Sequence, residues 1–208
     1  MPGLNSENHL YVSTNWSEQK KISPLQSDQR VIKKNITIGY LSADFRNHPL
    51  YYLIFDVLNN HNKNKFTIKL FYSGKPEDSD QYRNFVNINE SLIDISNFND
   101  EQSAKMISDE GVDILVDLSG FTKNTRSMCA AYRPAKVHVN WLGFAGSMGF
   151  HHGKPLFDFI LADKYVIPES HNKNYAEKII YLPNCYQPNI DNRPEIKVKA
   201  KEFYGFQN

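Results

Sequence analysis

The feature that most constrains the fold is a regular alternation of apolar and amphipathic stretches from residue 36 onward. Residues 112–118 (VDILVDL) are mostly apolar, which is typical of a strand that is buried on both faces of a parallel sheet. Strands that alternate with helices at this spacing favour a mostly parallel sheet with helices on both faces. We therefore predict an α/β, Rossmann-like fold.

The other predicted elements follow from the same periodicities. Besides 112–118, strands are expected at residues 36–41, 66–72, 92–95, 137–142, 157–161 and 178–182. Helices are expected from Pro49 onward, over 80–86, from the capping residue Asn99 to Glu110, and over 124–132.

The chain divides into three parts. Residues 1–34 are polar and aperiodic, so we expect a segment that is loose or that depends on something upstream of it. Residues 35–192 carry the alternation and form the predicted Rossmann-like domain. Residues 193–208 begin an amphipathic helix with no closing element after it, so we expect the start of a connection to a missing part.

Composition excludes several classes of partner and site. A formal net charge of +1, without a long run of one sign, gives no reason to expect nucleic acid or an anionic membrane as a partner. Cys129 and Cys185 are the only cysteines, which excludes a disulfide scaffold and a four-cysteine zinc site. The sequence has no visible signal peptide and no apolar run that would span a bilayer, so we expect a cytoplasmic protein.

Three loops rich in polar or small residues follow predicted strands. They are residues 42–49 (SADFRNHP), 118–126 (LSGFTKNTR) and 143–149 (GFAGSMG). In open α/β sheets, ligands bind outside the carboxyl ends of the strands, where such loops enter helices. We therefore expect the three loops to converge on one edge of the sheet and to form a binding site.

His48 is the candidate for chemistry in the first loop. Pro49 suits the first turn of a helix, which places His48 at or beside the N-cap. The positive end of the helix dipole disfavours an imidazolium there, so we expect a neutral ring that can accept a proton or donate a hydrogen bond to phosphate. The alternative is that Asn47 and His48 only cap the helix.

The other polar groups leave alternatives open. The glycines of residues 143–149 allow close approach of a ligand, or simply make a tight connection. In the second loop, Lys123 and Arg126 can neutralise anionic oxygens, or can be solvated surface charges. His151 and His152 lack a third ligand at a useful spacing, and adjacent histidines in an extended segment point to opposite faces, so no metal site is expected.

Five motifs carry a resemblance to a known family. They are GYLSADFRNHP, DILVDLSGFTKNTR, RPAKVHVNWLGFAGSMG, DFILADKYVIP and EKIIYLPNCYQPN, in this order. Together they resemble the catalytic region of the O-linked N-acetylglucosamine (O-GlcNAc) transferases and the SPINDLY-like proteins, which form glycosyltransferase family 41. The resemblance runs from about Ile36 to Asn192, with a weaker trace around residues 9–16.

The resemblance implies a GT-B architecture, in which two Rossmann-like halves enclose the active site, and this chain resembles the N-terminal half. A family member of this kind transfers N-acetylglucosamine from UDP-GlcNAc to a Ser or Thr hydroxyl, with inversion of the anomeric carbon and without a metal or other cofactor. The implied partners are a protein or peptide acceptor, the nucleotide sugar, the missing C-terminal catalytic half and upstream tetratricopeptide repeats.

The resemblance also implies roles for individual residues. His48 matches the histidine of the N-H-P motif and is implied as the catalytic residue. Contacts with substrate are implied for Gly120, Thr122, Arg126, Leu142, Gly143, Ala145 and Ser147. Phe121 stands where relatives have His or Tyr, while Ala145 and Ser147 replace a proline and a threonine; the loss of the proline makes the loop less rigid.

Two other functions stay open. SPINDLY-like relatives use GDP-fucose, which would make the protein an O-fucosyltransferase. The chain can also be a non-catalytic remnant that retains a peptide-contacting face. As an enzyme fragment, the chain alone is expected to lack the donor half-site and to be inactive.

Overall fold

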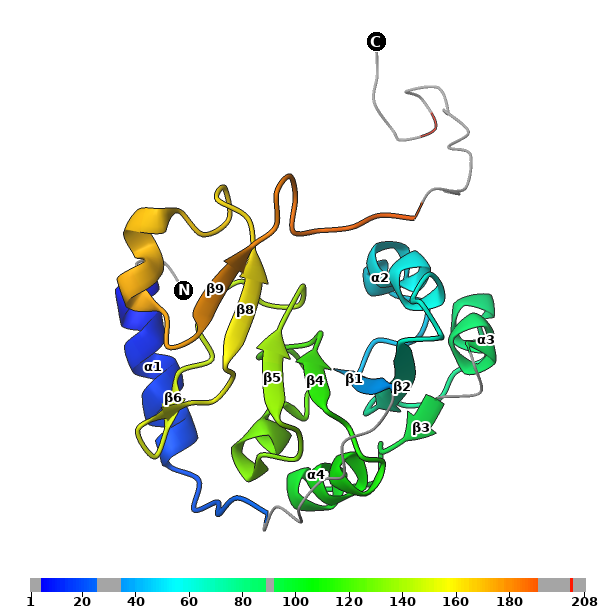
Figure 1. Cartoon of the computed structure of the whole chain (residues 1–208), viewed down its shortest axis with the longest axis horizontal. Helices are drawn as coiled ribbons and strands as arrows, with labels where there is room; N and C mark the ends of the chain where they lie inside the picture. The colour runs from blue at the N-terminus through cyan, green and yellow to red at the C-terminus, as the bar shows by residue number, and fades with distance from the viewer. Residues whose placement is uncertain (1–4, 26–34, 89–91, 191–202, 204–208) are drawn as a thin grey trace.

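The computed structural model describes residues 5–25, 35–88, 92–190 and 203, so the predicted connection at 193–208 lies almost wholly outside the described residues. Seven strands form one sheet: β1 (Ile36–Ser42), β2 (Phe66–Tyr72), β3 (Leu92–Asp94), β4 (Ile114–Asp117), β5 (Val137–Asn140), β8 (Phe159–Ala162) and β9 (Lys178–Tyr181). Their order is β3-β2-β1-β4-β5-β8-β9, and neighbouring strands run parallel (Figure 1). This is the doubly wound order, in which the chain switches direction between β1 and β4.

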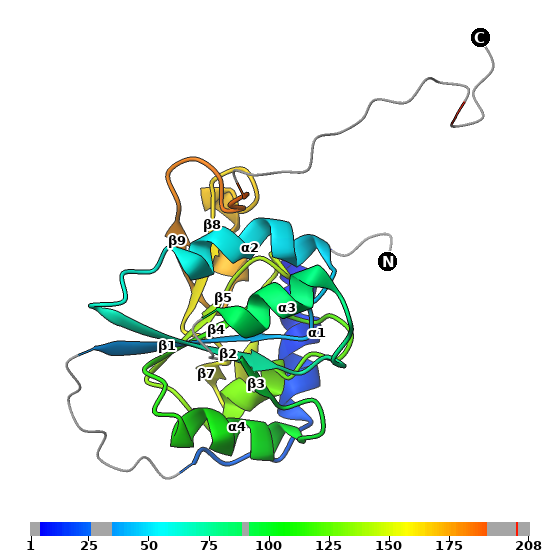
Figure 2. The same cartoon turned by 90° about the vertical axis from the view of Figure 1, so that its right-hand side faces the viewer.

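Helices cover both faces of the sheet. Figure 2 places α2 (Pro49–Asn59) and α3 (Asp80–Asn87) on one side and α4 (Asp100–Asp109) on the other. The 3-10 helix η1 (Ser127–Tyr132) packs with α4. The predicted α/β fold with a mostly parallel sheet is therefore confirmed.

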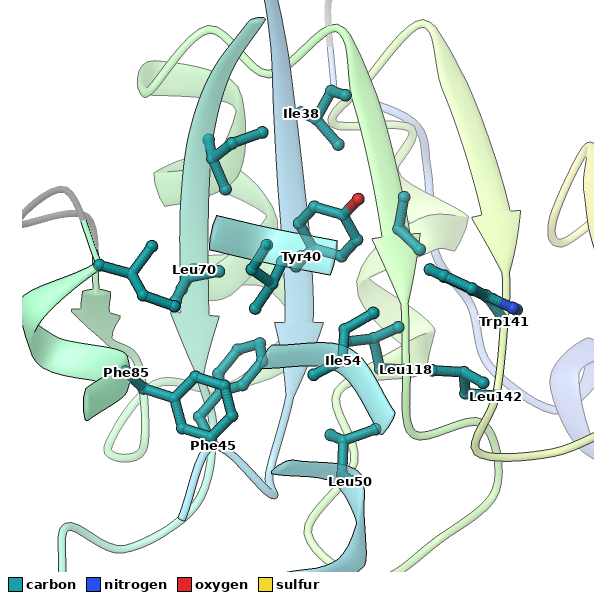
Figure 3. Close-up of a cluster of buried hydrophobic side chains, with 14 of the residues drawn as sticks. Ile38, Tyr40, Phe45, Leu50, Ile54, Leu70, Phe85, Leu118, Trp141 and Leu142 are labelled. Atoms are coloured by element: carbon teal, nitrogen blue, oxygen red, sulfur yellow. The ribbon is translucent and has the colours of Figure 1, made fainter. Parts of the chain in front are cut away.

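The larger core lies between the sheet and α2. Ile38 and Tyr40 of β1 face this core, while Leu41 faces the core beneath α4, as the alternation of side chains along a strand requires. Leu50 and Ile54 of α2 are buried against the same side of the sheet (Figure 3). Burying each such side chain contributes roughly 1.5–3 kcal/mol, and this burial fixes α2 directly above the switch point.

The N-terminal segment differs from its prediction. Residues Ser6–Glu18 form helix α1, which packs on the hairpin of β6 (Phe150–His151) and β7 (Lys154–Pro155) and beside the 3-10 helix η2 (Glu169–Asn174) (Figure 1). The side chains that α1 buries are Ser13 and Ser17. A helix that buries serines has no apolar stripe, so hydrophobic periodicity could not reveal it.

The helix predicted over 124–132 is also too long. Asn124 has a left-handed backbone with a φ of 62°, and the helical turn begins only at Ser127. The Thr125 hydroxyl accepts the Ser127 amide at 3.1 Å, which satisfies that amide outside a helix. Short side chains that bond nearby backbone in this way favour turns over helices.

Candidate functional site

The site lies where the chain switches direction across the sheet. β1 and β4 are parallel neighbours, so the loops that follow them leave the same edge. The two loops touch through the Ser42 and Ser119 hydroxyls, which are 3.3 Å apart, and the Ala43 amide donates to Ser119 Oγ at 3.3 Å. The loop after β5 leaves the same edge, because β4 and β5 are also parallel. The predicted convergence of the three loops is therefore confirmed.

A cleft of about 320 Å³ opens between these loops. It brings together four residues that the resemblance implied: His48, Thr122, Leu142 and Gly143. The rest of its lining is Asp44, Arg46, Pro49, Leu50, Leu53, Leu118, Lys123 and Asn124. Leu50, Leu118 and Leu142 are also part of the core under α2, so the floor of the cleft is the end of that core (Figure 3).

His48 is the N-cap of α2, as predicted. Its Nδ1 accepts the Leu50 amide at 3.2 Å, and Pro49 occupies the first turn. A nitrogen that accepts a hydrogen bond carries no proton, so the neutral ring has its proton on Nε2. Nε2 lies 3.9 Å from Asp44 Oδ2. In this arrangement His48 offers the cleft a hydrogen-bond donor.

Charged groups surround that donor. Arg46 donates to Asp44 Oδ1 from Nε at 3.1 Å and from a terminal nitrogen at 2.9 Å. This leaves Asp44 Oδ2 on the side of His48. Lys123, on the second loop, is exposed and adds a second cation to the lining. Two cations and an imidazole N–H suit a ligand with anionic oxygens, whereas Asp44 can accept a proton or hydrogen bond from a hydroxyl.

Asp117 shapes the second loop from beneath. It is fully buried and accepts the amides of Ser119 and Gly120 at 3.0 and 3.2 Å, together with the Ser127 hydroxyl. Burial raises the pKa of Asp117 to about 6, although these hydrogen bonds act to lower it.

Gly120 is a turn residue with a φ of 56°, and a Cβ there would lie 2.4 Å from Phe144 Cβ. Gly120 therefore supports the loop and does not line the cleft.

Arg126 turns away from the cleft. Its Nε donates to the Phe98 carbonyl at 3.0 Å, and Asp100 lies 3.9 Å from the same nitrogen. These contacts connect the second loop to the segment that enters α4. The structure therefore does not bring Arg126 to the other predicted residues.

The third loop is split between the cleft and the interior. Leu142 has a φ of 69°, which costs about 1 kcal/mol for a residue with a side chain, and both Leu142 and Gly143 line the cleft. Ala145 contributes its carbonyl to the Tyr175 hydroxyl at 2.9 Å instead. Ser147 is buried, and its hydroxyl donates to Glu177 at 2.8 Å. Neither Ala145 nor Ser147 reaches the cleft.

A second hollow of about 400 Å³ adjoins the cleft and shares Thr122 with it. Its other lining residues are His9, Val12, Ser13, Trp16, Phe121 and Thr125. Trp16 meets Phe121 edge to face at 5.2 Å. The sequence patterns did not indicate this hollow, because four of its residues come from α1. Asp44 and Arg46 belong to the polar first loop that was expected at the binding site, but no individual role was predicted for either.

The structure corrects one argument about the adjacent histidines. His151 and His152 do not point to opposite faces, because His152 lies in a tight turn with a φ of 48° and the two rings are 4.2 Å apart. Across the described ranges, no cluster of three or more His, Cys, Asp or Glu side chains is arranged to hold a metal ion. Within those same ranges, no helix has the length and apolar character needed to cross a bilayer.

Comparison with curated proteins finds relatives that are named as peptide N-acetylglucosaminyltransferases. The probable UDP-N-acetylglucosamine–peptide N-acetylglucosaminyltransferase SEC of Arabidopsis thaliana is 32% identical over 154 residues, which are 74% of this chain and 15% of that protein. The UDP-N-acetylglucosamine–peptide N-acetylglucosaminyltransferase of Caenorhabditis elegans is 28% identical over 155 residues, 74% of this chain and 13% of its own length. The probable transferase SPINDLY of Arabidopsis thaliana is 29% identical over 157 residues, 74% of this chain and 17% of its own length. The chain thus spans less than a fifth of these relatives.

The fold agrees with that comparison. A solved mutant of the Thermobaculum terrenum O-GlcNAc transferase superposes with a TM-score of 0.76 at 22% identity, over 90% of this chain and 36% of that chain. The family model described as glycosyl transferase family 41 matches residues 17–192, which include every motif of the resemblance and all three loops of the cleft. The chain therefore belongs to glycosyl transferase family 41.

Proposed function

We propose that the chain is the N-terminal half of the catalytic region of an inverting protein O-GlcNAc transferase, which moves the sugar of UDP-GlcNAc to Ser or Thr hydroxyls without a metal. The observation that carries the proposal is the cleft at the switch point, where His48, Thr122, Leu142 and Gly143 meet. The names of the curated relatives support the donor and the protein acceptor.

The cleft geometry favours particular roles for its polar groups. The acceptor oxygen attacks the anomeric carbon in line with the breaking bond to the diphosphate, which inverts that carbon. His48 acts through its Nε2 proton on an oxygen of the donor, since its Nδ1 holds the Leu50 amide. Asp44 can accept the proton of the acceptor hydroxyl while that cap stays intact. Lys123 and Arg46 stabilise the negative charge that develops on the leaving diphosphate.

The cleft is proposed to be one half of the donor site. The chain covers 36% of the Thermobaculum terrenum enzyme, so most of an enzyme of that size is outside the present sequence. We expect a second α/β half to supply the remaining contacts with the nucleotide, and tetratricopeptide repeats to present a protein acceptor, in the cytoplasm.

Calorimetric titration of this chain tests the half-site. UDP-GlcNAc, UDP and GDP-fucose should bind weakly or undetectably, because contacts from one wall of a cleft leave most of the ligand in water. Low-micromolar affinity for any of them would contradict the half-site proposal. Among weak binders, a clear preference for GDP-fucose would favour the SPINDLY-like O-fucosyltransferase.

Glycosyl transfer by the native-length protein tests the reaction. Incorporation of labelled GlcNAc into a Ser- or Thr-containing peptide should fall by roughly 100-fold in His48→Ala, within the range typical of one lost polar group at a reacting centre. His171→Ala is the matched control, because His171 is exposed on η2 and does not line the cleft. Unchanged transfer by His48→Ala would remove His48 from the mechanism.

A further inference from the structure

A buried carboxylate holds the far end of the third loop. Glu177 lies just before β9, and its Oε2 accepts the Ser147 hydroxyl at 2.8 Å while its Oε1 accepts the Met148 amide at 2.7 Å. The amides of Gly149 and Ala176 both donate to Ser147 Oγ at 3.1 Å. We call these five residues, Ser147, Met148, Gly149, Ala176 and Glu177, the Glu177 clasp.

The direction of every hydrogen bond in the Glu177 clasp is determined. Ser147 Oγ already accepts two amides, so its own proton must be donated, and Glu177 Oε2 is the acceptor. The Met148 amide occupies the other oxygen. The clasp therefore needs a side chain at 177 with two accepting oxygens. A glutamine at this position would turn an N–H₂ group toward one of the two donors.

The Glu177 clasp fixes a loop that begins in the cleft. Residues 142–149 start with Leu142 and Gly143 in the cleft wall and end at Gly149 in the clasp. Between these points, the Asn140 side chain donates to the Phe144 carbonyl at 3.1 Å, and the Tyr175 hydroxyl donates to Ala145. A Cβ on Gly143 would lie 2.2 Å from the Leu118 carbonyl oxygen, so the loop is in direct contact with the loop after β4. The loop is therefore held at the clasp, at Phe144 and at Ala145, and it packs against the loop after β4 at Gly143.

We propose that Glu177 is a positioning residue for sugar transfer, acting through Ser147 and Met148 on the part of the cleft wall formed by Leu142 and Gly143. Glu177 does not itself line the cleft. The expected effect on sugar transfer rests on the proposed function, whereas the effect on the loop can be measured without any substrate. The clasp also gives Ser147 a role different from the substrate contact that the resemblance implied.

Amide hydrogen exchange on the full chain tests the clasp. In Ser147→Ala, the amides of Gly149 and Ala176 lose their acceptor, so their protection factors should fall about tenfold or more, while Met148 keeps its carboxylate oxygen and changes less. In Glu177→Gln, the Met148 amide should lose protection where the side-chain nitrogen replaces Oε1. Where that nitrogen replaces Oε2, the Ser147 hydroxyl loses its acceptor, and the amides of Gly149 and Ala176 that donate to Ser147 Oγ should lose protection instead. Asp117→Asn is the matched control, because it alters a different buried carboxylate and should affect Ser119 and Gly120 instead.

The positioning role has a separate readout. Methyl NMR of leucine-labelled protein should show a shifted or split Leu142 signal in Glu177→Gln and in Ser147→Ala, with thermal unfolding still cooperative. In the native-length enzyme, the same variants should lower kcat/KM about tenfold or more, while His171→Ala leaves it unchanged.

The outcomes separate the two proposals. Loss of clasp protection with an unchanged Leu142 signal would overturn the positioning role, and so would protection factors that fall uniformly along the chain, which indicate only global destabilisation. A native-length protein that transfers no sugar would overturn the proposed function, while the exchange pattern and the Leu142 signal would still decide whether Glu177 positions the cleft wall.

Discussion

At the scale of single residues, two buried carboxylates support two of the loops around the cleft. Asp117 accepts two amides and a serine hydroxyl beneath the second loop, and Glu177 accepts a serine hydroxyl and an amide beneath the third. Burial raises the pKa of Asp117 to about 6 and that of Glu177 to about 7, against the effect of these hydrogen bonds. Both loops are therefore held by buried carboxyl groups whose charged form is disfavoured by burial.

The raised pKa of Asp117 makes stability depend on pH. The native state binds this proton more tightly than the unfolded chain does, so the contribution is fully present below the unfolded value of 3.8 and is lost as pH rises to about 6. Across this window the wild type should lose about 3 kcal/mol of unfolding free energy relative to Asp117→Asn. Denaturant unfolding of both proteins at a series of pH values measures the difference.

Asp109→Asn controls for the substitution itself, because Asp109 is exposed on α4. The pKa of Glu177 is also raised, so its titration overlaps that of Asp117 in pH. Because Glu177 is present in both proteins, its contribution cancels when the unfolding free energy of Asp117→Asn is subtracted from that of the wild type. A difference that stays constant with pH, or that grows in favour of the wild type, would contradict the prediction.

Gly143 makes a second prediction at this scale. In Gly143→Ala the new methyl group would meet the carbonyl oxygens of Leu118 and Ser119 at 2.2 and 2.7 Å, so the two loops must separate. Such overpacking should lower the unfolding free energy by about 1–3 kcal/mol and shift the methyl signals of Leu118 and Leu142. Denaturant unfolding and methyl NMR together measure both effects.

Gly153→Ala is the control, since nothing lies within 4 Å of a Cβ there and only its φ of 72° is unfavourable. It should lower the unfolding free energy by roughly 1 kcal/mol and leave both leucine signals in place. Equal effects of the two variants on the leucine signals would rule out the steric explanation.

At the scale of elements, α1 is attached by hydrogen bonds more than by an apolar stripe. The Ser17 hydroxyl donates to the Phe150 carbonyl, the Phe150 amide donates to Thr14 Oγ1 at 3.2 Å, and His151 Nδ1 lies 3.0 Å from the Ser17 carbonyl oxygen. All three contacts join residues more than 130 positions apart. The second hollow beside the cleft exists only when α1 is docked in this way.

Thr14→Val should loosen α1. The substitution keeps the shape of the side chain but leaves the Phe150 amide without its acceptor, which should cost about 1–2 kcal/mol and raise amide exchange at Phe150. Asn15→Ala, on the exposed side of the same helix, should change stability by less than about 0.5 kcal/mol. If both variants had the same small effect, the hydrogen bonds would not be what holds α1.

Asn99, which the sequence predicted as the capping residue of α4, forms a capping box with Gln102. Asn99 accepts the Gln102 amide at 2.9 Å, and Gln102 accepts the Asn99 amide at 3.0 Å. Asn99→Ala should cost about 1 kcal/mol of unfolding free energy in denaturant titrations. Asn97→Ala, the same change at an exposed position two residues earlier, should be close to neutral. An equal loss in both would mean that the cap contributes nothing measurable.

At the scale of the whole molecule, the cleft is a consequence of strand order. β2 and β3 lie on one side of β1, and β4 lies on its other side. The loops after β1 and β4 are distant in sequence, but they therefore leave the sheet side by side. The core under α2 runs to that edge and supplies the leucine floor (Figure 3). Polar groups then have to come from the loops alone, and this is why Asp44, His48 and Lys123 surround an apolar base.

Much of the fold and about half of the candidate site could be predicted from the sequence. The strands of the seven-stranded sheet and α2, α3 and α4 were found because their signals are local: side-chain alternation, helical spacing and caps within four residues. The short strands β6 and β7 were not predicted. The same locality explains His48, whose cap bond reaches only to Leu50. Leu142 and Gly143 were found through the resemblance, because their motif is continuous in sequence.

Only the tertiary structure decided the rest. Whether Ser147 faces a ligand or the interior depends on Glu177, 30 residues away, and Arg126 is turned aside by the Phe98 carbonyl, 28 residues away. Helix α1 depends on partners in β6 that a sequence pattern cannot indicate. The sequence by itself determined the strands of the seven-stranded sheet and α2, α3 and α4, because the patterns that indicate these elements lie between neighbours along the chain. The direction of each polar side chain was decided by where folding placed its distant hydrogen-bond partner, since a buried polar group is stable only when it is paired.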